Sequence, residues 1–384
     1  MRILLALTYY RPHVSGLTVY TERLATELVR RGHQITVMAS QHSANLPREE
    51  TMNGVQVVRV PVSFNISKGP VMPTLPAIAL RLISRHDLLN IHLPMFEASL
   101  LSVMGRIQKT PTVLTYHCDL ILPPGAFNRI VDHTVFSSNW VAAKRADRIV
   151  AYTHDYASHS QLVKRFRDKT VIIPPPVIMP TPADSDISDF RQAHGLADSK
   201  VLGFASRFAT EKGIEYLIRA LPRLIGKHPN LKVLFAGPYK EVIGEEAYRA
   251  RLQPEVDALV AEGRWEFLGT LGPTELAAFY ASIDVLLMTS INQTESFGLV
   301  QVEAMLCGTP VVATNLAGVR QPVRMTGMGE VVKIADADTL AEGIEQVLAS
   351  PDRYIKPRAE IERIFDLDVS VSSYEELFSQ IARS

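Results

Sequence analysis

The sequence predicts an α/β fold made of two doubly wound domains. Short apolar strands alternate with amphipathic helices along both halves of the chain, as expected for parallel sheets covered by helices. A proline-rich segment, Ile173 to Pro182, separates the two alternating halves. Proline at this density disfavours helix and sheet and forms a semi-rigid spacer, so we expect a domain boundary there.

The length and composition of the chain agree with two domains. The chain has 384 residues, of which 47% are hydrophobic and 21% charged. This is an ordinary globular composition, and the length exceeds what one core usually supports. We predict an N-terminal Rossmann-like domain over residues 1–175, a C-terminal one over 176–365, and a last amphipathic helix within 366–384.

No targeting or redox feature is predicted. The apolar run Met1 to Leu7 ends at Tyr9-Tyr10-Arg11-Pro12 without a small-residue cleavage site, so we interpret it as a first strand. No apolar stretch reaches the roughly 18 residues of a membrane-spanning helix. Cys118 and Cys307 lie far apart and in no ligand spacing. We therefore expect a cytoplasmic protein without a disulfide framework or a zinc site.

The formal net charge of zero conceals a polarity. Residues 1–175 contain 20 Lys and Arg against 11 Asp and Glu, a balance of +9, and the remainder contains 20 against 29, a balance of −9. The two domains are therefore expected to meet different partners.

The first half begins with a predicted strand over Ile3–Leu7 and a helix whose apolar stripe runs from Leu17 to Leu28. Arg30-Arg31-Gly32 ends this helix, because cations suit the C-terminal dipole and Gly32 suits a left-handed cap. Further strands are predicted over Ile35–Ala39, Val55–Val60, Leu88–His92, Thr112–Tyr116, Ile149–Tyr152 and Val171–Ile173.

Gly16 lies at the first strand-to-helix turn and is a candidate for phosphate approach. The alternative is a glycine needed only for the turn, because the chain contains no G-x-G-x-x-G motif.

A connection in the first half combines proline with basic and apolar residues. The prolines of the segment Lys68 to Pro76 predict a loop, and an apolar run with Arg81 and Arg85 follows it. Apolar side chains bracketed by cations can dock on an anionic membrane surface. A solvated connection over the core is the alternative interpretation.

The second half repeats the alternation of strands and helices. Strands are predicted over Val201–Ala205, Val233–Ala236, Trp265–Gly269, Val285–Met288, Pro310–Ala313 and Glu330–Ile334. Helices are predicted over Ile214–Ile225, Glu245–Glu262, Thr274–Ser282, Thr339–Leu348 and Val369–Ala382, with another that bears Glu303.

Two glutamates, Glu295 and Glu303, flank a predicted strand-to-helix junction at Phe297, Gly298 and Leu299. Free backbone amides at a helix start favour an anionic oxygen, and Gly298 would let a ligand approach closely. Carboxylates beside such amides suit a ligand that carries both hydroxyl and phosphate groups.

Arg207 and Lys212 follow the predicted strand Val201–Ala205. In open α/β sheets, ligands bind at the carboxyl ends of the strands. A guanidinium and an ammonium placed there can hold a diphosphate. As isolated residues they would more often be surface cations, and their interest comes from sharing a predicted sheet edge with Glu295.

His117 and Asp119 follow the predicted strand Thr112–Tyr116. They too lie at a carboxyl end of a strand, where ligands bind. A histidine satisfied by local backbone and an aspartate that caps a turn are the alternatives.

Several of these segments together resemble the retaining GT-B glycosyltransferases of family 4. The resemblance spans nearly the whole chain. Its specific part is the pair of glutamates in a Phe-Gly and Gly-Thr-Pro-Val-Val frame, and Arg31-Gly32-His33 and the Arg207…Lys212 pair are weaker markers. It implies two Rossmann-like domains facing across a cleft, with the last helix packed back on the N-terminal domain.

The resemblance also implies roles for individual residues. The C-terminal domain would bind a nucleotide sugar and the N-terminal domain an acceptor. Arg207 and Lys212 would hold the donor diphosphate, Glu295 the donor sugar, Glu303 the ribose, and Leu271 would lie by the base. The donor would also contact the amides of Phe297, Gly298 and Leu299 and, from the other domain, Gly16. His117 would lie beside the reacting sugar and Asp119 on the acceptor side.

Two departures from the family pattern stand out. The first loop reads Ser15-Gly16-Leu17 where relatives often have a glycine pair, and Pro174-Pro175-Pro176 replaces a common Pro-Asn-Gly. Close phosphate approach would then rest on one glycine, and hinge behaviour is put in doubt.

No metal or cofactor is expected. Three D-x-D triplets occur, at Asp184–Asp186, Asp336–Asp338 and Asp366–Asp368. None ends a predicted strand; the second is placed to cap the helix from Thr339, and the third precedes the last helix. Arg207, Lys212 and a helix dipole can meet leaving-group charge instead.

The sequence thus predicts a glycosyltransferase that moves a sugar from a nucleoside diphosphate donor to a sugar, polyol or lipid-linked acceptor. Peripheral contact with the inner face of an anionic membrane is an added expectation, and no nucleic-acid partner is expected. The alternatives are a nucleotide-sugar epimerase or hydrolase on the same scaffold and a non-catalytic sugar-binding protein. A nicotinamide dehydrogenase is disfavoured by the missing glycine motif.

Overall fold

The chain divides into two compact units. The computed structural model describes residues 1–66, 69–122, 125–242 and 244–382. Unit 1 comprises Met1–Pro176 and Asp366–Ser384, and unit 2 comprises Val177–Phe365. The C-terminal segment therefore belongs to the same unit as the first half of the chain.

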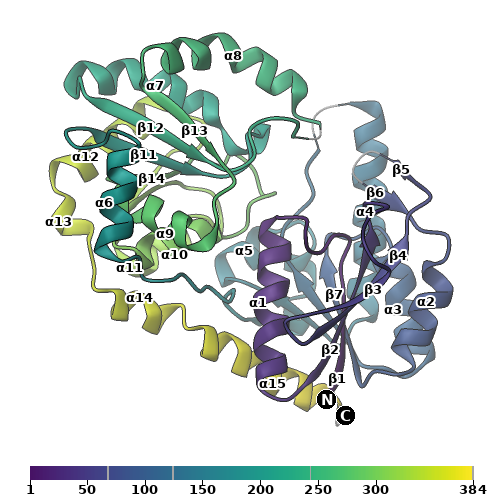
Figure 1. Cartoon of the computed structure of the whole chain (residues 1–384). Helices are drawn as coiled ribbons and strands as arrows, with labels where there is room; N and C mark the ends of the chain where they lie inside the picture. Colours follow the sequence, from purple (N-terminus) through teal and green to yellow (C-terminus); the bar gives the residue numbers. More distant parts are fainter. Residues whose placement is uncertain (67–68, 123–124, 243, 383–384) are drawn as a thin grey trace. The chain divides into compact units, whose positions relative to one another are not determined.

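Unit 1 is built on an eight-stranded sheet with the order β10-β9-β8-β7-β1-β2-β4-β3. Figure 1 labels β7, β1, β2, β4 and β3 of this sheet. All neighbouring pairs are parallel except β3 with β4. Its strands are β1 (Arg2–Ala6), β2 (Gln34–Gln41), β3 (Glu49–Met52), β4 (Val55–Pro61), β7 (Leu88–Leu93), β8 (Thr112–Tyr116), β9 (Arg148–Ala151) and β10 (Thr170–Ile172). A separate hairpin pairs β5 (Phe64–Ile66) with β6 (Gly69–Val71).

Helices cover both faces of this sheet. They are α1 (Gly16–Arg30), α2 (Leu75–Ile83), α3 (Ala98–Ile107), α4 (Ala126–Arg145), α5 (His154–His159) and α15 (Leu367–Ala382), with the short 3₁₀ turns η1 (Val163–Arg165) and η2 (Arg167–Lys169). Side chains alternate along each strand, so each face presents its own apolar set to the helices above it.

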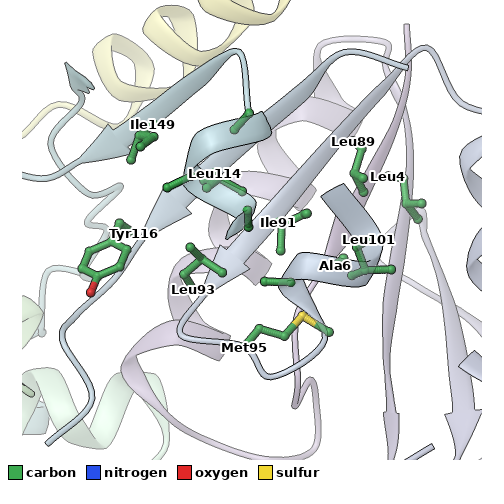
Figure 2. Close-up of a cluster of buried hydrophobic side chains, with 14 of the residues drawn as sticks. Leu4, Ala6, Leu89, Ile91, Leu93, Met95, Leu101, Leu114, Tyr116 and Ile149 are labelled. Carbon is green, nitrogen blue, oxygen red and sulfur yellow. The ribbon is translucent and has the colours of Figure 1, made fainter. Parts of the chain in front are cut away.

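One apolar cluster packs between the sheet and α2, α3, α4 and α5. Figure 2 shows part of it, with alternate residues of adjacent parallel strands, such as Leu4, Ile91 and Leu114, facing the same side. On the opposite face α1 and α15 lie side by side. Asn90, His92 and Thr115, which alternate with the clustered residues, face this second side.

Unit 2 repeats the design with a six-stranded parallel sheet of order β13-β12-β11-β14-β15-β16. Its strands are β11 (Lys200–Ala205), β12 (Leu231–Ala236), β13 (Trp265–Gly269), β14 (Val285–Met288), β15 (Val311–Thr314) and β16 (Gly329–Val332). Its helices are α6 (Asp184–Ala193), α7 (Ile214–Lys227), α8 (Glu246–Ala261), α9 (Pro273–Ser282), α10 (Leu299–Leu306), α11 (Gln321–Thr326), α12 (Ala337–Ala349), α13 (Pro351–Tyr354) and α14 (Arg358–Ile364), with the 3₁₀ turn η3 (Thr210–Lys212).

The predicted fold class of two doubly wound α/β units is confirmed. Every strand predicted from the sequence is present, with shifts of a residue or two at the ends. The helix that the Arg30-Arg31-Gly32 signal ends does stop at Arg30, and Gly32 has a left-handed φ of +90°. Within the described ranges, no helix has both the length and the apolarity needed to cross a membrane.

The loop predicted from Lys68 to Pro76 is partly wrong. Pro70 lies in β6, and Pro76 lies in the first turn of α2. Both positions tolerate proline, because an edge hairpin and the first helical turn each leave a backbone amide unpaired. Lys68 itself lies outside the described residues.

Candidate functional site

The candidate donor site lies where the strand order of unit 2 reverses. β11 is followed in sequence by β12 on one side and is flanked by β14 on the other. Loops that leave two such neighbouring strands diverge and open a crevice at their carboxyl ends, which is the usual ligand position in open α/β sheets. The loop after β11 carries Arg207 and Lys212, and the loop after β14 carries Glu295.

An ion pair joins these two loops. Nζ of Lys212 donates to Oε2 of Glu295 at 2.6 Å. The hydroxyl of Thr289 also donates to the carbonyl oxygen of Lys212, at 2.6 Å, which holds the η3 turn against the end of β14. The sequence prediction that Lys212 and Glu295 share one sheet edge is therefore confirmed.

The carboxylate of Glu295 is held in its charged form. Burial alone would raise its pKa, but the ammonium of Lys212 and the backbone amides of Gly298 and Phe297 outweigh burial, so its pKa is lowered. The carboxylate thus faces the ammonium on one side and the start of α10 on the other. Oε1 accepts a hydrogen bond from the Gly298 amide at 3.1 Å.

Gly298 is required by the backbone at the start of α10. Its φ of +79° lies in the left-handed region, and a Cβ there would come within 2.7 Å of Nε2 of Gln301. The side chain of Gln301 is itself bonded to the carbonyl oxygens of Phe297 and Val319. The side chain of Phe297 is buried and packs edge-on against Phe365, so the side chain does not face a ligand.

The remaining donor-side candidates take different places around this point. Leu299 is the first residue of α10, and Leu271 is half-buried just after β13. Arg207 is exposed and its guanidinium donates to Oε1 of Glu211 at 2.7 Å, so it shares the loop of Lys212 without sharing its partner. Glu303 is buried on α10, and the hydroxyl of Tyr280 on α9 donates to its Oε2 at 3.1 Å. The contribution of Tyr280 carries no sequence signal, because it depends on the packing of two helices.

Gly16 in unit 1 begins α1 but is not required by the backbone there. Nothing lies within 4 Å of a Cβ built at this position, and its φ is not left-handed. The neighbouring Ser15 caps the helix, with its Oγ accepting from the Thr18 amide at 3.2 Å. A glycine would be needed at this position only if a ligand approached the start of α1 closely.

His117 follows β8, as predicted, but its side chain points into the interior. It is 5% exposed, and both ring nitrogens are engaged. Nε2 lies 2.8 Å from Nδ1 of His92, and Nδ1 is hydrogen-bonded to the hydroxyl of Tyr152. If that hydroxyl donates, His117 carries its proton on Nε2 and donates to His92.

His92 and Tyr152 were missed by sequence reasoning. His92 lies within the apolar strand Leu88–Leu93, where a lone histidine gives no sign of a partner. The two imidazoles stack with centroids 5.1 Å apart, and Tyr20 of α1 packs edge-on against His117 at 4.9 Å. Burial lowers the pKa of His92 to about 3, and burial together with His92 lowers the pKa of His117 well below its usual range.

Asp119 lies in the interior, and the geometry favours a structural role over the acceptor-side role that the resemblance implies. Its Oδ1 accepts from the hydroxyls of Tyr116 at 2.6 Å and Ser160 at 2.8 Å, and its Oδ2 accepts from the Gln161 amide at 3.0 Å. A buried carboxylate with these three donors ties the end of β8 to the segment that follows α5.

The D-x-D triplets serve local structure. Asp336 caps α12 by accepting from the Thr339 amide at 2.9 Å, as predicted. Asp186 accepts from the Ala183 amide at the start of α6, and Asp368 pairs with Arg31. In the part of the chain that the structure describes, no three His, Cys, Asp or Glu side chains converge as they would around a metal ion.

Two family models match the chain, one in each unit. Residues 15–176 match "Glycosyl transferase 4-like domain", and residues 186–363 match "Glycosyl transferases group 1". The two matches leave out residues 1–14, 177–185 and 364–384.

Individual proteins match over most of their length. The chain is 28% identical over 374 residues to the GDP-mannose-dependent alpha-(1-6)-phosphatidylinositol monomannoside mannosyltransferase of Mycolicibacterium smegmatis, covering 91% of this chain and 90% of that protein. It is 27% identical over 365 residues to a 2-deoxystreptamine N-acetyl-D-glucosaminyltransferase of Streptomyces fradiae, covering 89% and 85%. An Anabaena protein solved with UDP and glucose shares the fold with a TM-score of 0.79 and 23% identity, over 99% of this chain and all of that one.

Proposed function

This chain belongs to the glycosyltransferases of group 1 with a 4-like N-terminal domain, and from that premise we propose that it transfers a glycosyl group from a nucleoside diphosphate sugar to an acceptor hydroxyl. The observation that carries the proposal is the Lys212–Glu295 ion pair beside the first amides of α10. It brings a cation, a carboxylate and helix-start amides to one sheet edge, which are the groups that a sugar diphosphate needs.

Each group has a distinct task in this proposal. Lys212 and Arg207 bind the diphosphate, and with the N-terminus of α10 they stabilise the negative charge that develops on the leaving group, so no metal ion is required. Glu295 accepts hydrogen bonds from hydroxyls of the donor sugar, and Glu303 accepts them from hydroxyls of the ribose. Leu271 contacts the base. The relative named GDP-mannose-dependent supports a nucleotide-sugar donor.

Transfer proceeds with retention of the anomeric configuration in this proposal. The family resemblance supports retention. Glu295, the carboxylate proposed to contact the sugar, is paired with Lys212 and is therefore a poor nucleophile, which argues against a covalent intermediate on this residue. The departing phosphate then accepts the proton of the acceptor hydroxyl. It thereby guides the acceptor oxygen to the face of the sugar ring from which the phosphate leaves. His117 would position groups around the reacting sugar through its backbone and packing, because its ring nitrogens are engaged.

The acceptor binds on unit 1 and is a glycan or a lipid-linked molecule. Support for a lipid part comes from apolar side chains exposed on α4, where Phe127 is 55% and Ile130 65% exposed. On α2, Leu80 and Arg81 are exposed, and Arg85 is exposed just after it. This combination suits peripheral contact with an anionic leaflet.

The donor site is tested by the variants Glu295→Ala, Lys212→Ala and Arg207→Ala. A mass-spectrometric screen of nucleotide sugars first identifies a competent donor. We expect each variant to lower transfer by at least about tenfold, the effect of losing one charge-assisted interaction. Lys200→Ala, at the amino end of β11, is the matched control. Transfer near the wild-type rate in all three variants would disprove the proposal.

Two further measurements address the alternatives and the membrane. Incubation with the donor alone identifies an epimerase or hydrolase, because neither needs an acceptor, and donor binding without any product identifies a sugar-binding protein. Co-sedimentation with phosphatidylserine liposomes at low and high salt tests the membrane contact, and no binding at low salt rules it out.

A further inference from the structure

The loop that carries Lys212 is held by side chains from another part of unit 2. This loop follows β11, forms the turn η3 and leads into α7. In the proposed function the ammonium of Lys212 binds the diphosphate. The contacts that hold the turn therefore decide where that ammonium lies.

Glu245, the residue immediately before α8, holds the start of the turn. Its Oε2 accepts from the backbone amide of Thr210 at 2.9 Å and from the hydroxyl of Thr210 at 2.7 Å, although 35 positions separate the two residues. The side chain of Glu245 is 5% exposed. Hydrogen bonds to a carboxylate with so little access to water are strong, so this contact fixes the start of η3 firmly.

Glu245 does not serve its own helix in the usual way. A carboxylate at a helix start normally accepts from the free amides of the first turn. The side chain of Glu245 makes no such capping bond to α8. The neighbouring Glu246 is exposed, and its Oε1 accepts from the Gly244 amide at 3.2 Å. Of the two adjacent glutamates, Glu246 thus has the local contact and Glu245 reaches across to the donor loop.

Two further contacts hold the rest of the turn. The hydroxyl of Tyr248 on α8 accepts from the Ile214 amide at 3.0 Å and donates to the buried carboxylate of Glu215. On the opposite side, the Ile291 amide donates to the carbonyl oxygen of Glu211 at 3.0 Å. The turn is therefore held between α8 and the loop after β14.

We propose that Glu245 is a positioning residue of the donor site, which acts through Thr210 to fix the turn that carries Lys212. Without this carboxylate, the start of η3 keeps the local bond from the Lys212 amide to the Ala209 carbonyl oxygen, at 2.9 Å. A single 3₁₀ turn is weak by itself, so the ammonium would lose its fixed place. This inference rests on the proposed function and names a further residue on which the same donor site depends.

The test is isothermal titration calorimetry of the full chain with GDP and with UDP. We expect Glu245→Ala to weaken binding of the tighter diphosphate by about tenfold, as expected when charge-assisted hydrogen bonds are lost. Glu245→Gln keeps an oxygen that can accept from Thr210 and should stay within about threefold of the wild type. Glu255→Ala, which removes an exposed glutamate of the same helix, is the matched control.

A double-mutant cycle with Lys212→Ala separates positioning from a general effect on stability. If Glu245 acts through Lys212, adding Glu245→Ala to Lys212→Ala should weaken diphosphate binding by less than about threefold more. Independent effects would multiply to about a hundredfold loss. Thr210→Val removes only the hydroxyl donor and should weaken binding by about threefold to tenfold, and Thr210→Ser should restore it. Thermal unfolding shows that each variant is folded at the temperature of the titration, and Thr210→Val carries the same cycle if Glu245→Ala does not fold.

The outcomes separate this inference from the proposed function. The inference fails if Glu245→Ala and Thr210→Val bind the diphosphate as the wild type does, or if their losses multiply with that of Lys212→Ala. It also fails if Glu245→Gln binds as weakly as Glu245→Ala. In each of these cases a tenfold loss of transfer in Lys212→Ala would still support the donor site. Wild-type diphosphate binding and transfer in Lys212→Ala would instead overturn the donor site, and this inference with it.

Discussion

The hydroxyl oxygens of Tyr20 and Tyr374 lie 2.6 Å apart in the interior of unit 1, although 354 positions separate the two residues in the sequence. The Tyr374 hydroxyl also lies 3.1 Å from Oγ1 of Thr115 on β8. The last helix is therefore joined both to α1 and to the strand that precedes His117. Because Tyr20 packs on His117, α15 supports the surroundings of that histidine.

Tyr374→Phe is expected to destabilise unit 1. The substitution keeps the ring but leaves the buried Tyr20 and Thr115 hydroxyls with one partner fewer. An unsatisfied buried hydroxyl costs about 1–3 kcal/mol, which is the expected loss in the free energy of unfolding. Chemical denaturation followed by circular dichroism measures it. Tyr216→Phe, on half-buried Tyr216 of α7, is the control, and an equal loss in both variants would contradict the role of the Tyr20–Tyr374 contact.

Arg31 and Arg30 should differ sharply when each is replaced by alanine. Arg31 is 17% exposed and donates to Glu27, Asp368 and Glu375, so it anchors α15. Arg30 is 66% exposed and pairs mainly with Glu27. We expect Arg31→Ala to lower the free energy of unfolding by about 1–3 kcal/mol and Arg30→Ala by less than about 1 kcal/mol.

The anchoring by Arg31 also predicts that part of the free energy of unfolding is lost in acid. Burial raises the pKa of Glu375, but Arg31 and His33 outweigh it and lower that pKa below its ordinary value of 4.5. Its contribution is therefore present above pH 4.5 and is lost as the pH falls through the lowered pKa. Denaturation at pH 7 and pH 3.5 should show a smaller acid loss in Arg31→Ala than in the wild type. An unchanged acid loss would mean that Glu375 does not depend on Arg31.

Local patterns in the sequence predict the strands and the sheet edge of the candidate donor site well, because these features depend on residues that are neighbours in the chain. The apolar run before Glu295 and the helical spacing after Gly298 place that glutamate at a strand-to-helix junction, where the structure has it. The proximity of Lys212 follows from the rule that carboxyl ends of parallel strands share an edge.

Contacts between distant segments could not be predicted in the same way. The partners of His117 come from β7 and the end of β9, and the donor to Glu303 comes from α9. A histidine in an apolar strand and a tyrosine in a helix carry no mark of what they will face. Two of the three donors to Asp119, Ser160 and Gln161, likewise lie about 40 residues away in the sequence, so its interior position could not be predicted.

Gly298→Ala and Gly16→Ala should separate a glycine needed by the fold from one needed by a ligand. Alanine at Gly298 must take a left-handed φ and meets the side chains of Gln301 and Met288, so we expect a loss of at least about 1 kcal/mol of stability. Alanine at Gly16 has open space in a helix, so stability should be unchanged or rise by up to about 1 kcal/mol.

The transfer kinetics of the Gly16→Ala variant then show whether a ligand approaches Gly16. If a phosphate approaches the N-terminus of α1, the added methyl group should raise the KM for the donor while the thermal midpoint stays at or above the wild-type value. A Gly16→Ala enzyme with both wild-type stability and wild-type kinetics would remove Gly16 from the donor site.

The His92–His117 pair should make unit 1 less stable as the pH falls through the mildly acidic range. Both histidines have lowered pKa values in the folded chain, His92 to about 3, so below pH 6.5 the unfolded chain binds protons that the folded chain does not. Stability is then lost at up to about 1.4 kcal/mol per pH unit for each histidine, until the folded pKa is reached. His92→Gln retains an oxygen that can accept from His117 but has no group that titrates. The free energy of unfolding should therefore depend less steeply on pH between pH 6.5 and pH 4.5, by up to about 1.4 kcal/mol per pH unit. His133→Gln, an exposed histidine on α4, is the matched control, and an equal slope in the His92→Gln variant and the wild type would show that His92 is protonated in the folded chain.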